Sequence, residues 1–242
     1  MGYTWNWHVF LEPSPEGGTY LSFLLDGLLW TLATAAAAWL LALAAGSAVG
    51  VMRTLPWRWA RGLGTAYVEI FRNIPVLVQL FLWYFVVPEI IPAAWGNWLK
   101  ALPDASFYTA VTAIGLYMSS RVAEQVRAGI QSLPPGQQMA AAALGLSPAQ
   151  AYRHVLLPVA YRLILPPLTS EMLATIKNTA VAMTIGLLEL TNRARAIQEY
   201  TFQVFEAFTA AVVIYLALNI AVTCAMRLLE HRLAVPGLIR TK

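Results

Sequence analysis

Charged residues are scarce in this chain of 242 residues: Asp, Glu, Lys and Arg together make up 12% of it, about half the share found in ordinary soluble domains. Hydrophobic residues make up 59%. A chain with so little charge cannot cover a water-exposed surface of the usual kind. The composition therefore predicts a membrane protein.

Residues for catalysis and for metal binding are also few. The single cysteine, Cys224, excludes a disulfide framework and a thiol pair. The three histidines, His8, His154 and His231, are scattered, and neither His-Glu-x-x-His nor Gly-x-Ser-x-Gly occurs. No Gly-x-x-x-x-Gly-Lys sequence is present, so the chain has no phosphate loop for ATP. We predict a protein without enzymatic activity, metal or cofactor.

Long apolar runs take the place of those features. Three runs contain no Asp, Glu, Lys or Arg, namely 27–52, 105–120 and 207–226. A helix rises 1.5 Å per residue, so runs of about 20 residues cross the hydrocarbon core of a membrane, and the second run is marginal by itself. Two further runs, 76–88 and 163–188, carry few polar residues. We expect an all-α protein with about five transmembrane helices.

The basic residues lie in alternate connections between these runs. Lys100, Arg193 and Arg195 fall on one side. Eleven of the sixteen basic residues fall on the other: Arg53, Arg58, Arg61, Arg121, Arg127, Arg153, Arg162, Arg227, Arg232, Arg240 and Lys242. Because cytoplasmic loops carry the excess of Lys and Arg, the N-terminus is predicted outside and the C-terminus inside. The net charge of +4 thus follows topology and gives no reason to expect nucleic-acid binding.

We expect one membrane domain over residues 1–242. Residues 1–22 contain no Lys or Arg, so they are not a signal peptide, and Trp5 and Trp7 indicate a periplasmic segment at the membrane interface; a disordered tail is the alternative. Residues 228–242 are expected to form a cytoplasmic tail. These features predict a multi-pass membrane protein, and the family resemblance given below implies a bacterial inner membrane.

Two local patterns within the runs predict helix geometry. Gly46 and Gly50 form a small-xxx-small pattern, which lets two helices approach closely. Pro75 removes one backbone hydrogen bond and is expected to bend its helix beside the polar residues Asn73 and Gln79.

The connection 125–161 is the least lipid-like part of the chain and predicts a cytoplasmic helical hairpin. Residues 137–144 favour a helix, and Gly145 can adopt the left-handed conformation that ends it. Ser147 and Pro148 are typical of the start of a second helix, which we expect to end at Pro158. A protruding Ala-rich hairpin with few charges is suited to enter a groove on a partner protein.

Within this hairpin, Met139-Ala-Ala-Ala-Ala-Leu-Gly145 is followed after nine residues by Val155-Leu-Leu-Pro158. The spacing resembles the cytoplasmic loop by which permeases of ATP-binding-cassette (ABC) importers dock on their ATPase. Met139 stands where that family usually has Glu. The resemblance implies the fold of a type I importer permease and an ATPase-coupling role for six residues: Met139, Ala140, Ala141, Gly145, Leu157 and Pro158.

The chain further resembles the polar amino acid branch of these permeases, through Glu69-Ile-Phe-Arg-Asn-Ile-Pro75, Glu124-x-x-Arg127 and Leu133-Pro-x-Gly-Gln137. Trp5-Asn-Trp7 and Thr169-Ser-Glu-Met172 are similar to a glutamate/aspartate permease subunit. The resemblance implies import of a polar, acidic amino acid, with another such as glutamine or a basic amino acid as the alternative. It also implies four kinds of partner: an ABC ATPase dimer, a second and non-identical permease subunit, a periplasmic solute-binding protein and the lipid membrane.

Polar residues near the spans are the candidate substrate-binding groups. Arg121 falls where related permeases often carry Tyr, and a guanidinium binds a carboxylate through two parallel hydrogen bonds. The alternatives are an ion pair with Glu124, one turn away, or a charge that merely flanks the span. The remaining candidates are Glu124 itself, Arg72, Asn73 and Gln79.

Two questions about these groups stay open in the sequence. Arg72 lies one turn from Glu69, so these two residues either pair with each other or contact substrate. Glu171 and Lys177 are six residues apart and lie on different faces of a helix, so each needs a separate partner. A channel or secondary transporter also needs polar groups within the membrane but needs no protruding hairpin, and ATP consumption distinguishes it from an importer.

Overall fold

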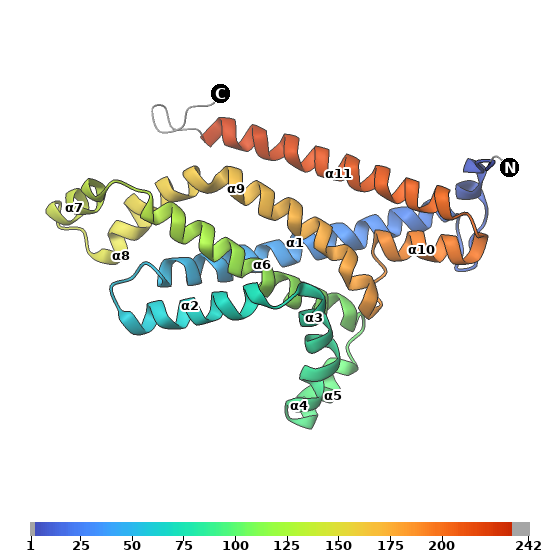
Figure 1. Cartoon of the computed structure of the whole chain (residues 1–242), viewed down its shortest axis with the longest axis horizontal. Helices are drawn as coiled ribbons and strands as arrows, with labels where there is room; N and C mark the ends of the chain where they lie inside the picture. The colour runs from blue at the N-terminus through green and yellow to red at the C-terminus, as the bar shows by residue number, and fades with distance from the viewer. Residues whose placement is uncertain (1–2, 234–242) are drawn as a thin grey trace. The chain divides into compact units, whose positions relative to one another are not determined.

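The computed structural model describes residues 3–233, and they are almost entirely helical (Figure 1). Within them the only β-type pairing is an isolated bridge between Pro13 and Thr19. The elements in chain order are η1 (Trp7–Leu11), α1 (Tyr20–Met52), α2 (Arg58–Asn73), α3 (Val76–Phe81), η2 (Leu82–Val86), α4 (Val87–Ile90), α5 (Ala93–Lys100), α6 (Ala105–Gln131), α7 (Pro135–Ala143), α8 (Pro148–Ala151), η3 (Tyr152–Leu156), α9 (Leu157–Asn178), η4 (Thr179–Ile185), α10 (Leu190–Thr201) and α11 (Val204–Leu233). The predicted all-α fold is confirmed.

Helices long and apolar enough to cross a membrane are present. By length and composition, α1 and α11 qualify alone. Two sharply bent pairs qualify together: α2 with the helical segment 76–90, and the segment 148–185 with α10. The marginal run 105–120 lies in α6, whose 27 residues extend about 40 Å. By length and composition the described chain thus has two helices that can cross a membrane, or up to four if each bent pair forms one span, and the count of about five stays a prediction.

The chain folds as two compact units. The first comprises Met1–Trp39, Pro75–Gly115 and Ala174–Val222. The second comprises Leu40–Ile74, Leu116–Leu173 and Thr223–Lys242. The helices α1, α6, α9 and α11 each contribute residues to both units. Of the predicted C-terminal tail, residues 228–233 continue α11, and 234–242 lie outside the described residues.

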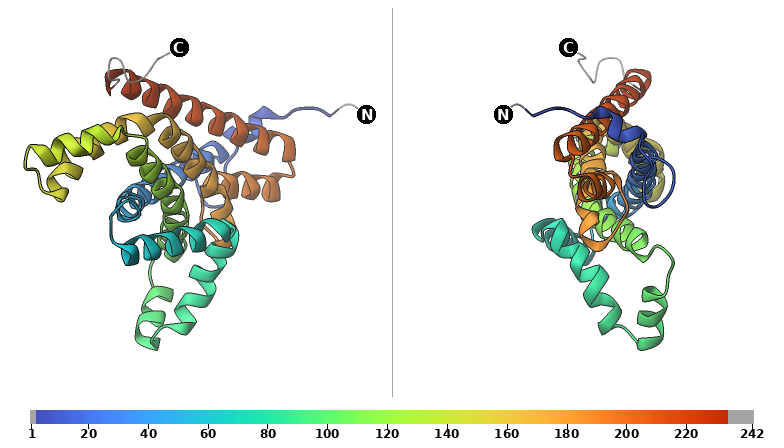
Figure 2. Two further views of the ribbon diagram at one scale, coloured as in Figure 1. Left: turned by 60° about the vertical axis from the view of Figure 1, so that its left-hand side comes forward. Right: turned by 90° about the vertical axis from the view of Figure 1, so that its right-hand side faces the viewer.

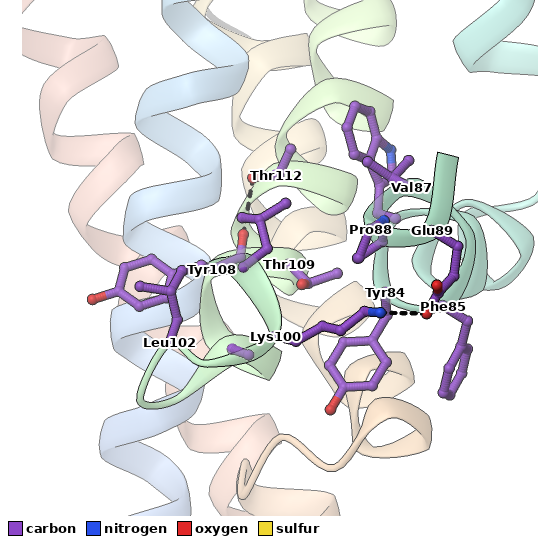
Figure 3. A pocket seen from close by; sticks show the side chains of 13 residues that line it. Tyr84, Phe85, Val87, Pro88, Glu89, Lys100, Leu102, Tyr108, Thr109 and Thr112 are labelled. Atoms are coloured by element: carbon purple, nitrogen blue, oxygen red, sulfur yellow. Dashed lines mark hydrogen bonds and ion pairs between the residues drawn. The ribbon is translucent and has the colours of Figure 1, made fainter. Parts of the chain in front are cut away.

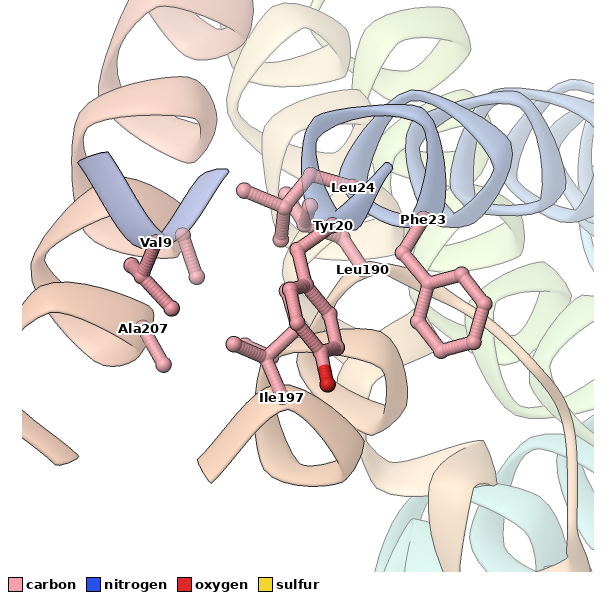
Figure 4. Close-up of a cluster of buried hydrophobic side chains, with 9 residues drawn as sticks. Val9, Tyr20, Phe23, Leu24, Leu190, Ile197 and Ala207 are labelled. Carbon is pink, nitrogen blue, oxygen red and sulfur yellow. The ribbon is translucent and has the colours of Figure 1, made fainter. Parts of the chain in front are cut away.

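The core of the first unit joins the N-terminal segment to α1, α10 and α11 (Figure 4). Its buried members are Val9, Tyr20, Phe23, Leu24, Leu190, Ala194, Ile197, Ala207 and Ala211. Leu190 donates its backbone N–H to the buried Thr31 hydroxyl at 3.1 Å, which satisfies one of the free donors at the start of α10. The apolar packing therefore fixes how α10 begins against α1.

The N-terminal segment is ordered by packing and by hydrogen bonds. Val9 is only 1% exposed. Glu206, fully buried at the start of α11, accepts a hydrogen bond from the Asn6 backbone N–H at 2.7 Å and another from the Tyr3 hydroxyl. Trp5 and Trp7 stack on each other and remain half exposed. The disordered tail considered above is wrong for the described residues 3–19.

An arm of short helices projects within the first unit, with α4 and α5 side by side (Figure 2). The two helices approach so closely at Gly96 that an added Cβ would lie 2.0 Å from the carbonyl oxygen of Pro88. Only glycine fits this contact, because any larger residue would force the arm apart.

The second unit is built on close contact between the end of α1 and α6. A Cβ added to Gly46 would lie 2.7 Å from the Ser119 carbonyl oxygen, and one added to Gly50 would lie 2.7 Å from Val126 Cβ. The small-xxx-small pattern is therefore a helix contact, as predicted, and this contact lies within the chain.

Two prolines are accommodated by widened turns. The π-helical turns η2 and η3 end two residues before Pro88 and Pro158. The Leu157 N–H bonds to the Tyr152 carbonyl, five residues back. This widening relieves the clash between a proline ring and the preceding turn. The helix therefore continues past Pro158 to Asn178, and the predicted end at Pro158 is wrong.

Pro75 acts more strongly than predicted. The backbone of Ile74 is extended, with φ −95° and ψ 126°, so α2 ends there and α3 begins after Pro75. The residue before a proline is driven out of the helical region by the ring, which explains the break.

Candidate permease site and coupling hairpin

The predicted hairpin is formed by α7, a short turn and α8 (Figure 1). Gly145 has φ +77°, the left-handed conformation expected for it. Its N–H bonds to the Ala142 carbonyl at 3.0 Å, and the Leu146 N–H bonds to the Ala141 carbonyl at 3.1 Å. These two bonds form a Schellman motif, which satisfies the free carbonyl groups at the end of α7.

The second helix begins with a capping box. The Ser147 hydroxyl accepts from the Gln150 N–H at 3.4 Å, and the Gln150 side chain accepts from the Ser147 N–H at 2.8 Å. Pro148 occupies the first helical position, where no N–H is needed. Ser147 and Gly145 thus set the turn from both sides.

The hairpin exposes apolar residues at its tip. Met139 is 66% exposed and Leu144 is 80% exposed, and Ala140 is exposed as well. Ala141 is buried, with 2% of its surface accessible. Of the other residues predicted for ATPase coupling, Leu157 is half-buried and Pro158 exposed.

Arg121 forms a bidentate ion pair with Glu171. Nε of Arg121 lies 2.5 Å from Oε2 of Glu171, and Nη2 lies 3.3 Å from Oε1. The Glu171 side chain is 8% exposed, whereas that of Arg121 is 43% exposed. The predicted need of Glu171 for a partner of its own is confirmed, and the alternative pairing of Arg121 with Glu124 is wrong.

Glu124 belongs to a different charge network. It accepts from Arg127, one turn further along α6, with Nε at 3.2 Å, and also forms an ion pair with Arg53 at the end of α1. Arg127 in turn donates to Gln131. Two guanidinium groups therefore hold Glu124, and this carboxylate acts as a junction between α1 and α6.

The polar residues before Pro75 are paired differently from the Glu69–Arg72 pairing considered in the sequence analysis. Glu69 accepts a hydrogen bond from Asn73 Nδ2 at 2.8 Å. Among the described residues Arg72 forms no ion pair, so the Glu69–Arg72 pairing is wrong. Gln79 is 2% exposed in α3 of the first unit.

Within the second unit, the candidates Arg72, Asn73, Arg121 and Glu124 do not contact each other through any hydrogen bond or ion pair between described residues. Asn73 binds Glu69, Arg121 binds Glu171, and Glu124 binds Arg53 and Arg127. Arg121 is the one candidate whose charged group is both held by a carboxylate and substantially exposed.

The first unit contains a cavity of about 490 Å³ beside α4, α5 and the start of α6 (Figure 3). Aromatic rings of Trp83, Tyr84 and Tyr108 contribute to its lining. Lys100 and Glu89 form an ion pair of 2.5 Å in its wall, with both side chains largely exposed. The sequence analysis did not identify this cavity or the residues that line it.

Two buried charged residues of the first unit, Glu189 and Arg193, were also missed as structural charges. Glu189 caps α10, accepting from the Asn192 N–H at 2.7 Å and from the Tyr215 hydroxyl at 2.8 Å. Arg193 is 5% exposed and pairs with Glu16 at 2.9 Å. A carboxylate directly before a helical stretch is a capping signal, so Glu189 could have been found from the sequence, whereas the partner of Arg193 could not.

Comparisons with known proteins agree with this arrangement. The family described as "Binding-protein-dependent transport system inner membrane component" matches residues 40–235. The glutamate/aspartate import permease protein GltJ of Escherichia coli (strain K12) is 46% identical over 241 residues, covering 98% of both chains. The probable glutamine ABC transporter permease protein GlnM of Bacillus subtilis (strain 168) is 34% identical over 88% of this chain and 94% of its own.

Solved structures show the same fold. A chain of an amino acid ABC transporter determined with histidines has a TM-score of 0.74 and 31% identity, covering 88% of this chain and 95% of its own. A chain of the inward-facing MetNI methionine ABC transporter has the same TM-score of 0.74 at 20% identity, which is a likeness of fold alone. This protein belongs to the family of inner-membrane components of binding-protein-dependent transport systems, the non-catalytic permease subunits of ABC importers.

Proposed function

We propose that this permease imports an acidic amino acid, glutamate or aspartate, across the inner membrane. The observation that carries the proposal is the 46% identity to a glutamate/aspartate import permease over 98% of both chains. The 34% identity to a probable glutamine permease keeps glutamine as the second candidate. In this assignment the chain works with an ATPase dimer, a second homologous permease subunit and a periplasmic solute-binding protein.

The hairpin of α7 and α8 docks on the ATPase in this proposal. Its exposed apolar tip, with Met139 and Leu144, supports this role because an apolar surface outside the membrane is normally covered by a partner. Met139 stands where related permeases carry Glu, so contact at this position is apolar and needs no salt bridge. The hairpin then lies in the cytoplasm, with the N-terminus outside.

Arg121 is the substrate-binding residue best supported by the geometry. Its guanidinium already holds one carboxylate in bidentate fashion, and the Arg121 side chain is 43% exposed, so a carboxylate of the substrate can reach it. Asn73 and Gln79 are proposed to line the path as uncharged hydrogen-bonding groups. Arg72 is proposed as an accessible cation on that path, and Glu124 supports the path by holding α1 to α6.

The test is transport by the whole complex. A tagged copy of this chain is purified from its own cells with its co-purifying subunits and reconstituted into liposomes that contain ATP. Glutamate, aspartate, glutamine and arginine are then offered together with the binding protein. We expect ATP-dependent uptake of glutamate or aspartate. Preferred uptake of glutamine or arginine would refute the acidic substrate, and uptake independent of ATP would refute the importer.

A further inference from the structure

The end of α1 is the meeting point of three neighbours in the second unit. Gly50 packs against α6, and Arg53 forms an ion pair with Glu124 of the same helix. A Cβ added to Gly64 of α2 would lie 2.7 Å from Arg53 Cγ, so α2 also lies against this end of α1. Any force applied here therefore reaches both α2 and α6.

The third neighbour is the second helix of the hairpin. The Tyr152 hydroxyl lies 3.0 Å from Thr54 Oγ1 and donates to the Thr54 carbonyl at 3.2 Å. Thr54 Oγ1 itself donates to the Val51 carbonyl at 2.7 Å, so the single Tyr152 proton is shared between the Thr54 carbonyl and Thr54 Oγ1. Two turns further on, the Tyr161 hydroxyl contacts Ser47 Oγ on α1.

Tyr152 occupies a stiff position between the hairpin tip and these contacts. It begins the π turn η3, which continues without a break from α8 and into α9. The first hairpin helix, α7, packs on both α8 and η3. A push on the tip is therefore carried along a continuous helix to Tyr152, whose hydroxyl contacts both the carbonyl and the hydroxyl oxygen of Thr54 in the turn that follows α1.

We propose that Tyr152 is a positioning residue that links the coupling hairpin to the end of α1 through Thr54, so that movement of the hairpin is transmitted to the membrane helices. The inference rests on the proposed docking of the hairpin on an ATPase. In this proposal the Tyr152 ring keeps the hairpin folded by packing, and the Tyr152 hydroxyl transmits the position of the hairpin to α1. Removing the Tyr152 hydroxyl should therefore leave ATPase docking intact but raise the ATP hydrolysed per amino acid imported.

The experiment uses the purified complex in liposomes and compares four variants. Tyr152→Phe removes the donor, and Thr54→Val removes the Thr54 hydroxyl while the backbone carbonyl stays. Thr54→Ser keeps the hydroxyl, and Tyr200→Phe is a matched control at a half-exposed tyrosine. The measured quantities are ATPase retained on the complex and ATP hydrolysed per amino acid imported.

We expect Tyr152→Phe and Thr54→Val to retain the ATPase but to raise the ATP hydrolysed per amino acid imported by about threefold to tenfold, the scale of one neutral hydrogen bond. Thr54→Ser and Tyr200→Phe should match the wild type. An unchanged ratio in Tyr152→Phe, or a loss of bound ATPase in that variant, would overturn the inference. If Tyr152→Phe does not fold, the difference between Thr54→Val and Thr54→Ser decides. A wild-type complex that binds no ATPase would instead refute the proposed function.

Discussion

The Arg121–Glu171 ion pair gives a test of substrate selection in which two substitutions should act in opposite directions. The guanidinium already donates to both oxygens of Glu171, at 2.5 and 3.3 Å. A substrate carboxylate that binds Arg121 through these same two nitrogens must therefore displace Glu171. Removing Arg121 should weaken binding of glutamate, whereas removing the charge of Glu171 should strengthen it.

The structure sets the size of each effect. Arg121→Gln removes hydrogen bonds to a charged group, which contribute about 1.5 to 3 kcal/mol, so the dissociation constant for glutamate should rise roughly tenfold to a hundredfold. The same change leaves Glu171, 8% exposed, without its guanidinium and should lower the folded yield. Glu171→Gln leaves Arg121, 43% exposed, open to water, so its structural cost should be small.

The assay is equilibrium binding of radiolabelled glutamate to the detergent-purified complex without the binding protein. Transport rates are unsuitable here, because half-saturation of transport also includes capture by the binding protein. The double variant, Arg121→Gln with Glu171→Gln, is the control: it should recover the folded yield but not the affinity. If both single variants weaken glutamate binding alike, or neither changes it, the pair is only a brace between α6 and α9.

Two further predictions use matched glycines. Gly145→Val should reduce the amount of ATPase that co-purifies with the complex, because a side chain at φ +77° costs about 1 to 2 kcal/mol. The control Gly136→Val, in equally open space but without positive φ, should leave that amount unchanged. Equal amounts of ATPase in the two variants would contradict docking through this turn. Gly50→Val should lower the thermal unfolding temperature of the purified complex, because the valine side chain would collide with Val126 and overpacking costs about 1 to 3 kcal/mol. The control Gly62→Val, with no neighbour within 4 Å, should leave that temperature unchanged. Equal unfolding temperatures in the two variants would refute the close contact of α1 and α6.

The turn of the hairpin was predictable from the sequence because its signals are local. Gly145 alone can supply the positive φ at low cost, and Ser147 with Pro148 specifies the start of a helix within three residues. The end at Pro158 was predicted wrongly because a π turn accommodates the proline, and no pattern in the sequence distinguishes a helix that ends from one that widens.

The charged partners were not predictable, because they depend on packing between distant segments. The sequence offered Arg121 only neighbours on its own helix, and Glu124 was the obvious one. In the fold, α9 brings Glu171 to Arg121 from fifty residues away, and α1 brings Arg53 to Glu124 from seventy-one residues away. The residues were identified correctly as interesting, but their pairing needed the three-dimensional structure.

The paired state of these charges follows from the cost of ions away from water. An unpaired carboxylate as buried as Glu171, 8% exposed, is strongly unfavourable, so the empty site keeps Glu171 paired with Arg121. A resident carboxylate such as Glu171 satisfies Arg121 while the site is empty, and an arriving carboxylate can replace it with little change in the number of ionic contacts. Exchange of this kind makes binding depend on the difference between two similar interactions, which keeps affinity moderate and release possible. On this reasoning, a substrate without a side-chain carboxylate gains nothing to offset the loss of the Arg121–Glu171 pair, and selection for acidic amino acids arises from the pair as a whole.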